Sequence, residues 1–233
     1  MTLQLRDIRG ERRDVPVGPR VPVTIAVLAS TDVRRTLTRA LHADLLRRAA
    51  ERHDALPELV VIGDQPPGTG ELLAALNCRP AAPWAGRAHV VVGADGPDEA
   101  IVCEPAESGA LLTHVGLDVR LAMLDRTDDV VAAAAELDRW RAVVAVWAES
   151  PSKPMCADYV GWCHDAIDDD LDTPRLLRLM REVESHPELP PGSKFETFAH
   201  LDRLVGLDLA GQVGLGDSAA STRWTSIRLV PPL

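Results

Sequence analysis

Hydroxyl, acidic and basic side chains follow directly after the first long apolar run of the chain, VPVTIAVLA. They are Ser30, Thr31 and Asp32, followed by Arg34 and Arg35. Hydroxyls can donate to a phosphate, arginine adds positive charge, and the N-terminus of a helix favours anions. Asp32 would repel a bare phosphate, so a ribose or amine contact suits it better. The alternative interpretation is an ordinary Ser/Thr/Asp helix cap beside an empty cleft.

A second polar group follows the next apolar run, ELVVIGD, where Gly63 and Asp64 come after the apolar residues. Open α/β sheets bind ligands at the carboxyl ends of their strands. The sequence therefore predicts a nucleotide-facing crevice formed by Ser30, Thr31, Asp32, Arg34, Arg35, Gly63 and Asp64. The glycines of GDQPPGTGE lack the lysine of a P-loop, so we expect a vestigial ATP site without a resident cofactor. We assign no catalytic residue.

Cysteine and histidine side chains suggest a metal site only weakly. Cys156 and Cys163 are seven residues apart, so their sulfurs would share a helix face, and His164 is adjacent. A fourth ligand is lacking, and small cysteines at this spacing are ordinary core residues. His114, in the apolar segment LLTHVG, is interpreted as a core or capping residue. We therefore expect no bound metal.

The stretch AIDDDLDTP (166–174) places four acids within five positions. An Asp or Thr N-cap would accept a bond from an orphan N–H group, and Pro174 suits a first helical turn. A calcium loop is the alternative, but the glycine and distal glutamate of such loops are missing. The pattern therefore predicts a helix start.

Composition limits the class of protein. The chain has 233 residues, 46% of them hydrophobic, and a net charge of −10, which argues against DNA and against a broad nucleic-acid footprint. No apolar run approaches a membrane span, and the charged start does not resemble a signal peptide. The four cysteines contain no CxxC pair and are expected to be reduced. We expect a cytoplasmic protein that does not contact membranes.

Hydrophobic periodicity predicts two kinds of structure along the chain. Residues 1–20 are predicted to be a β arm with VPVGP as its turn, and 21–109 a truncated Rossmann-like parallel sheet with a helix over 31–53. From residue 110 the period changes to 3.6, which predicts about five helices in a bundle over 110–210. A Gly/Ser-rich tail with one strand is predicted for 211–233. The fold class is therefore α/β followed by α.

The order of these blocks resembles the cysteinyl-tRNA synthetase family across nearly the whole chain. HADLLRRAAERHDALPELVVIGD takes the place of the family's first helix and second strand, and ELLAALNCRPAAPWAGRA resembles its "ALN…RP…PRAT" stretch. Asp118 and Arg120 in THVGLDVRLAMLDR fill an Asp and an Arg at the start of the helical domain. LDRWRAVVAVW matches a later helix, and AIDDDLDTP matches "AMDDDxNTP", the most specific of these motifs. The resemblance implies a class I synthetase-type helical bundle and descent shared with the mycothiol-pathway cysteine ligase.

The departures from that family concern its catalytic motifs. Residues 33–36, VRRT, replace HIGH, and Ile25 and Ala26 fall where the first zinc-ligand cysteine is expected. EPAESGA (104–110) takes the place of KMSKS and has no lysine to stabilise pyrophosphate. The resemblance therefore implies that cysteine activation and zinc binding are lost.

Three hypotheses of function remain. The first is a non-catalytic paralogue that binds tRNA, another RNA or a protein. The second is an ATP-dependent ligase that joins cysteine or another amino acid to tRNA or a small acceptor. The third is a structural or regulatory subunit. Loss of both ATP motifs and of the zinc site favours the first and third, and the acidic charge favours a protein partner over RNA. The sequence leaves the oligomeric state open.

Overall fold

The computed structural model describes residues 2–84, 86–109, 114–214 and 227–228. The chain divides into two compact units. Unit 1 consists of Met1–Ser108 with Ile167–Asp172, and unit 2 consists of Gly109–Ala166 and Thr173–Leu233. The short segment Ile167–Asp172, which lies inside the range expected for the helical bundle, thus groups with the α/β unit.

Unit 1 begins with the expected β-hairpin. β1 (Gln4–Arg6) and β2 (Arg12–Asp14) pair in antiparallel fashion. The turn lies at residues 7–11, where Asp7 Oδ1 accepts two backbone N–H groups at 2.9 Å and Gly10 adopts a φ of 82°. VPVGP, predicted as a turn of this arm, follows β2 and does not join the two strands; the Asp and Gly of DIRGE supply the side-chain acceptor and positive φ of the hairpin turn.

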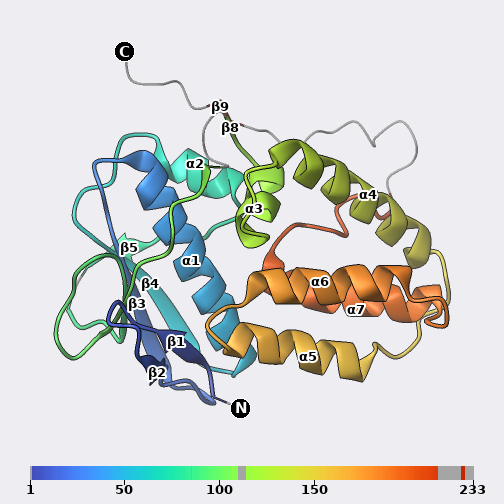
Figure 1. Ribbon diagram of the computed structural model, residues 1–233, viewed down its shortest axis with the longest axis horizontal. Coiled ribbons are helices and arrows are strands. Elements are labelled where there is room, and N and C mark those ends of the chain that lie inside the picture. The colour runs from blue at the N-terminus through green and yellow to red at the C-terminus, as the bar shows by residue number, and fades with distance from the viewer. Residues whose placement is uncertain (1, 85, 110–113, 215–226, 229–233) are drawn as a thin grey trace. The chain divides into compact units, whose positions relative to one another are not determined.

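Five parallel strands form the main sheet of unit 1, in the order β5-β4-β3-β6-β7 (Figure 1). They are β3 (Pro22–Leu28), β4 (Leu56–Ile62), β5 (Ala82–Pro83), β6 (Val90–Val92) and β7 (Ile101–Cys103). Their central residues are apolar and mostly β-branched, as in a parallel sheet covered on both faces. The expected α/β class with a Rossmann-like parallel sheet is confirmed.

Two helices belong to this sheet. α1 (Val33–Arg52) connects β3 to β4 and packs along the sheet, while the short α2 (Thr69–Ala75) precedes β5 (Figure 1). The apolar stripe predicted for α1 is buried at Leu37, Leu41 and Leu45. Burial of that stripe stabilises the helix, because most helical stability in proteins comes from packing of an apolar face.

Unit 2 is mainly helical. Its elements are β8 (His114–Val115), α3 (Leu117–Leu124), α4 (Val130–Ala148), α5 (Ala157–Asp168), α6 (Thr173–Ser185), α7 (Pro191–Val205) and β9 (Ile227–Arg228). The last two residues of α5 group with unit 1. Among the described residues, the main sheet ends with β7 at Cys103, and the helices of unit 2 begin with α3 at Leu117.

Scarce aromatic residues gather in the core of unit 2. The Phe198 ring on α7 packs edge-on against Trp140 and Trp147 of α4, at centroid distances of 5.7 and 5.2 Å. The fully buried Arg120 on α3 donates from Nε to Val205 O at 2.6 Å. Apolar packing and a buried guanidinium on a helix-terminal carbonyl thus tie α3, α4 and α7 together.

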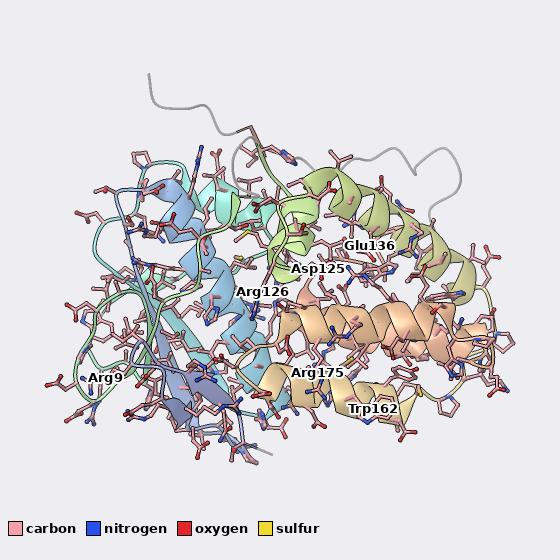
Figure 2. The ribbon with its side chains drawn as sticks, viewed as in Figure 1. Arg9, Asp125, Arg126, Glu136, Trp162 and Arg175 are labelled. Carbon is pink, nitrogen blue, oxygen red and sulfur yellow. The ribbon has the colours of Figure 1, made fainter. Side chains whose placement is uncertain are left out.

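Arg181 of α6 joins two further elements of unit 2. Its Nη2 lies 2.6 Å from Asp125 Oδ2, after α3, and 2.7 Å from Glu136 Oε2 of α4. Figure 2 labels both acids on these neighbouring elements. The hydrogen bond to Glu136 and the nearby carboxylates raise the pKa of Arg181 above its ordinary value.

The C-terminal tail is described only in part. β9 pairs with β8 in antiparallel fashion, whereas residues 215–226 and 229–233 of the expected tail lie outside the described residues. Within the described part of the chain, none of the helices combines the length and the apolar character that crossing a membrane requires.

Candidate functional site at the carboxyl edge of the sheet

The carboxyl ends of four parallel strands meet at one edge of the sheet in unit 1. β3 lies between β4 and β6 although β4 follows it directly in sequence, so the strand order reverses between β3 and β6. Ligands of open α/β sheets bind at such a reversal. The candidate site is therefore the set of loops after β3, β4, β6 and β7.

The loop after β3 satisfies its own polar groups. Asp32 Oδ1 accepts the Arg34 N–H at 2.9 Å, as an N-cap does, and the Asp32 N–H donates to Ser30 Oγ at 3.1 Å. The Ser30 N–H donates to Thr36 Oγ1 at 3.0 Å. Thr31 is exposed. A carboxylate thus sits at the N-terminus of α1, where an external anion would otherwise bind.

Thr36 was not among the predicted site residues. Its hydroxyl lies 3.0 Å from Ser30 O and 3.2 Å from Asp32 O, and the residue is fully buried. Its spacing from Asp32 is that of one helical turn, which could have indicated a back-bonded threonine. Thr36 fixes the loop conformation and has no exposed atom to offer a ligand.

The predicted cations are only partly available. Arg34 and Arg35 are both exposed, and Arg35 donates through Nε to Glu107 Oε1 at 3.0 Å and also through Nη2. The hydrogen bond to Glu107 raises the pKa of Arg35. No ion pair involves Arg34 among the described residues. Of the two predicted phosphate contacts, one is therefore already neutralised by a carboxylate.

Arg39 is the buried cation of this edge. Its Nη1 donates to Leu28 O, at the end of β3, at 2.8 Å. Its Nε lies 3.0 Å from both carboxylate oxygens of Glu104, directly after β7, and the Arg39 side chain is 5% exposed. Because β6 lies between β3 and β7, this ion pair spans the end of β6 at the reversal of strand order.

The loop after β4 lies beside the loop after β3. Ala29 N–H donates to Ile62 O at 2.9 Å, and a Cβ on Gly63 would lie 3.8 Å from Ala29 Cβ. Gly63 adopts a φ of 87°, which glycine tolerates best. Asp64 is exposed. Gly63 therefore forms the turn, and Asp64 adds another negative charge.

Glycine after β6 is explained by packing. A Cβ on Gly93 would lie 2.5 Å from Leu28 Cβ, closer than two side chains can approach. Gly93 N–H also donates to Cys103 O at 2.8 Å. The close approach of β6 to β3 thus accounts for this residue without a ligand.

The edge as a whole offers little attraction to a polyphosphate. Two of its guanidiniums, Arg35 and Arg39, are matched by glutamates of the segment after β7, and Asp32 occupies the helix start. Opposite charges at such distances cancel most of each other's field beyond their own contact. The predicted residues lie on neighbouring loops, but carboxylates stand where phosphate oxygens would be needed.

Thiol and metal chemistry find little support in the described residues. Burial raises the pKa of Cys103 and of Cys163 to about 12 each, so both are protonated thiols at neutral pH. Among the described residues, no group of three or more His, Cys, Asp or Glu side chains is arranged to hold a metal ion. His164 contacts His200 at 3.2 Å, and His114 contacts Asp118 at 2.7 Å.

The acid cluster has a role that sequence reasoning missed. Asp168 is 5% exposed and binds Arg52 and His53 at the end of α1, with His53 Nε2 at 2.9 Å. Asp169 lies 2.7 Å from Arg12 of β2. These carboxylates therefore attach the segment Ile167–Asp172 to the rest of unit 1.

The remaining residues of the cluster form a similar attachment and lead into the start of α6. Asp170 Oδ1 accepts the Arg6 N–H at 2.7 Å, and its own N–H donates to Gln4 O at 3.0 Å. α6 begins at Thr173, as predicted, and Thr173 Oγ1 donates to Leu124 O at 2.6 Å. The pairing of these aspartates with arginines far away in the sequence could not have been predicted from AIDDDLDTP alone.

The described part of the chain thus consists of an α/β unit with a Rossmann-like parallel sheet and of a helical unit. At the carboxyl edge of the sheet, Arg35 and Arg39 are paired with glutamates of the same unit. No protein-family model matches the chain, and no curated protein matches it. The class of the protein therefore rests on its fold and on the geometry of this edge.

Proposed function

We propose that the chain is a non-catalytic binding or regulatory protein derived from a cysteinyl-tRNA synthetase-like ancestor. Its helical unit would correspond to the synthetase-type bundle, and its parallel sheet to a truncated nucleotide-binding fold. The partner is a protein or a tRNA, and the net charge of −10 favours a protein.

One observation carries this proposal. Glu104 and Glu107 belong to the segment that replaces KMSKS, and they pair with Arg39 and Arg35 of α1. A synthetase uses positive charge in that segment to stabilise the pyrophosphate that leaves. Carboxylates in that segment would repel the negatively charged pyrophosphate. The replacement of cations by anions therefore supports loss of the adenylation step.

Pyrophosphate exchange tests the proposal. The full chain is incubated with ATP, labelled pyrophosphate and each amino acid in turn, and a tRNA titration is run beside it at low salt. We expect no exchange with any amino acid. Exchange with cysteine or another amino acid would overturn the proposal in favour of an ATP-dependent ligase.

The tRNA titration separates the two kinds of partner. Saturable binding that weakens steeply with salt would identify RNA as the partner. If tRNA does not bind, a protein partner is the remaining form of the proposal, and affinity capture with the immobilised chain is the next step.

A further inference from the structure

α4 carries apolar side chains on its solvent-exposed side. Val131 is 82% exposed and Val146 is 65% exposed. Ala132, Ala135 and Ala142 are exposed as well. Apolar side chains in a stripe along a helix normally pack against another element. This exposed side of α4 therefore lacks a packing partner among the described residues.

The exposed residues form one continuous face. Positions spaced by three, four or seven lie on the same side of a helix, which groups Val131, Ala135, Asp138, Ala142 and Val146. The two alanines occupy the middle of this face, two helical turns apart. Small central side chains allow another helix axis to approach at the short end of the 8–10 Å range that helix packing uses.

The exposed face of α4 presents the same apolar side chains in either direction along the helix. Its midpoint lies between Asp138 and Arg139, and Val131 is as far before that point as Val146 is after it. Ala135 and Ala142 are related in the same way. A two-fold axis through the midpoint would therefore place valine opposite valine and alanine opposite alanine in an antiparallel helix pair, as an isologous contact requires.

Charge fits this pairing as well. The two-fold would place Asp138 of each copy opposite Arg139 of the other. Asp138 is exposed and has no ion pair among the described residues. Arg139 contacts Glu136 and Glu184, which hold it in place, while 48% of its side chain stays exposed to solvent.

We propose that a second copy of this chain packs on the exposed face of α4, antiparallel and related by this two-fold axis. The Asp138–Arg139 pairs lie at the axis and set the register, and Val131, Ala135, Ala142 and Val146 form the apolar contacts on either side of them. Asp128 and Glu149 meet at each end, where exposure and salt screen their repulsion. One helix pair is smaller than a standard interface, so the dimer is reversible.

Sedimentation equilibrium over a concentration series tests the pairing on the full chain. We expect wild type to shift reversibly from monomer to dimer. Asp138→Arg alone would place arginine opposite arginine, and Arg139→Glu alone would place glutamate opposite aspartate. Each should raise the dissociation constant by about tenfold or more. Ala135→Glu should do the same by inserting bulk at the centre.

A mixture of the two charge variants gives the sharpest result. In an Asp138→Arg and Arg139→Glu heterodimer both cross pairs are again of opposite sign, so association should return in the mixture. Glu188→Arg, the same charge change on an exposed residue outside α4, serves as the control and should associate like wild type. Thermal unfolding of each variant confirms that the fold is intact.

Three results would overturn the proposal. They are a wild type that stays monomeric at every concentration, association that Asp138→Arg and Ala135→Glu leave unchanged, and a charge-variant mixture that does not associate while its components remain folded. Restored association in the mixture of charge variants requires this register, because a dimer formed through another surface would not depend on the pairing of residues 138 and 139.

Discussion

Arg39 of α1 and Glu104, the first residue after β7, form an ion pair in which the Arg39 Nε lies 3.0 Å from both carboxylate oxygens. The same guanidinium donates to Leu28 O at the end of β3 at 2.8 Å. The pair thus fastens two strand ends on either side of β6 at the reversal of strand order. A place that commonly receives a ligand contains a structural ion pair in this protein.

Glu104→Ala is expected to destabilise unit 1. Arg39, whose side chain is 5% exposed, would keep its bond to Leu28 but lose its counter-charge. Removing one partner of a buried pair leaves an uncompensated charge, and the partial exposure of Glu104 softens the cost to about 2 kcal/mol. Urea unfolding followed by circular dichroism measures the loss.

Glu107→Ala is the matched control for that variant. Its pair with Arg35 is exposed on both sides, with 45% and 64% of the side chains accessible. Exposed ion pairs contribute little, so the change in unfolding free energy should stay within about 0.5 kcal/mol. Equal losses for the two variants would contradict the structural role assigned to Arg39.

Sequence patterns predicted the local elements better than their long-range charge pairs. The apolar runs after residues 21 and 58 and the Leu37, Leu41 and Leu45 spacing are local, so they predicted β3, β4 and α1. The Arg39–Glu104 pair joins residues 65 positions apart, and no periodicity links them. The Asp32 cap could be predicted because an N-cap depends only on neighbouring residues.

Asp168→Asn is expected to weaken the attachment of Ile167–Asp172 to unit 1. The buried carboxylate accepts from Arg52 and His53, and an amide keeps the shape but removes the charge. We expect a loss of about 2 kcal/mol in unfolding free energy. Asp165→Asn, for which no ion pair is found among the described residues, should change stability by less than about 0.5 kcal/mol. Similar effects of the two variants would argue against the attachment.

The cysteines should differ in reactivity on the native chain. Burial raises the pKa of Cys103 and Cys163 to about 12, from an ordinary 9.0. At neutral pH both remain thiols, so iodoacetamide should modify the partly exposed Cys156 first. Peptide mass spectrometry after brief labelling measures this order, and modification of Cys103 at the rate of Cys156 would contradict it.

The same shift has a consequence for stability. A folded-state pKa above the unfolded value contributes stability that is fully present below the unfolded pKa and lost as pH rises through the folded one. Unfolding free energy should therefore decline between about pH 9 and 12 in part through these two thiols. Replacing both with alanine should flatten that part of the profile, although it lowers stability at neutral pH by creating cavities.

Changing Arg34 and Arg35 together to Ala tests whether the edge binds an anion. If the start of α1 contacts nucleotide or RNA, the double variant should bind more weakly and with a shallower salt dependence. Both side chains are exposed, so thermal stability should be nearly unchanged. If wild type binds neither ligand at low salt, the prediction that Ser30, Thr31 and Asp32 line a nucleotide site fails.

Calorimetric titration of the wild-type chain with Mg–ATP at low salt tests the central claim most directly. Carboxylates of Glu104, Glu107 and Asp32 stand at the edge where phosphates would bind, so we predict no saturable heat of binding. Glu107→Ala, which releases Arg35, should show more affinity for Mg–ATP than wild type does. Stoichiometric, saturable binding of Mg–ATP to wild type would contradict the account.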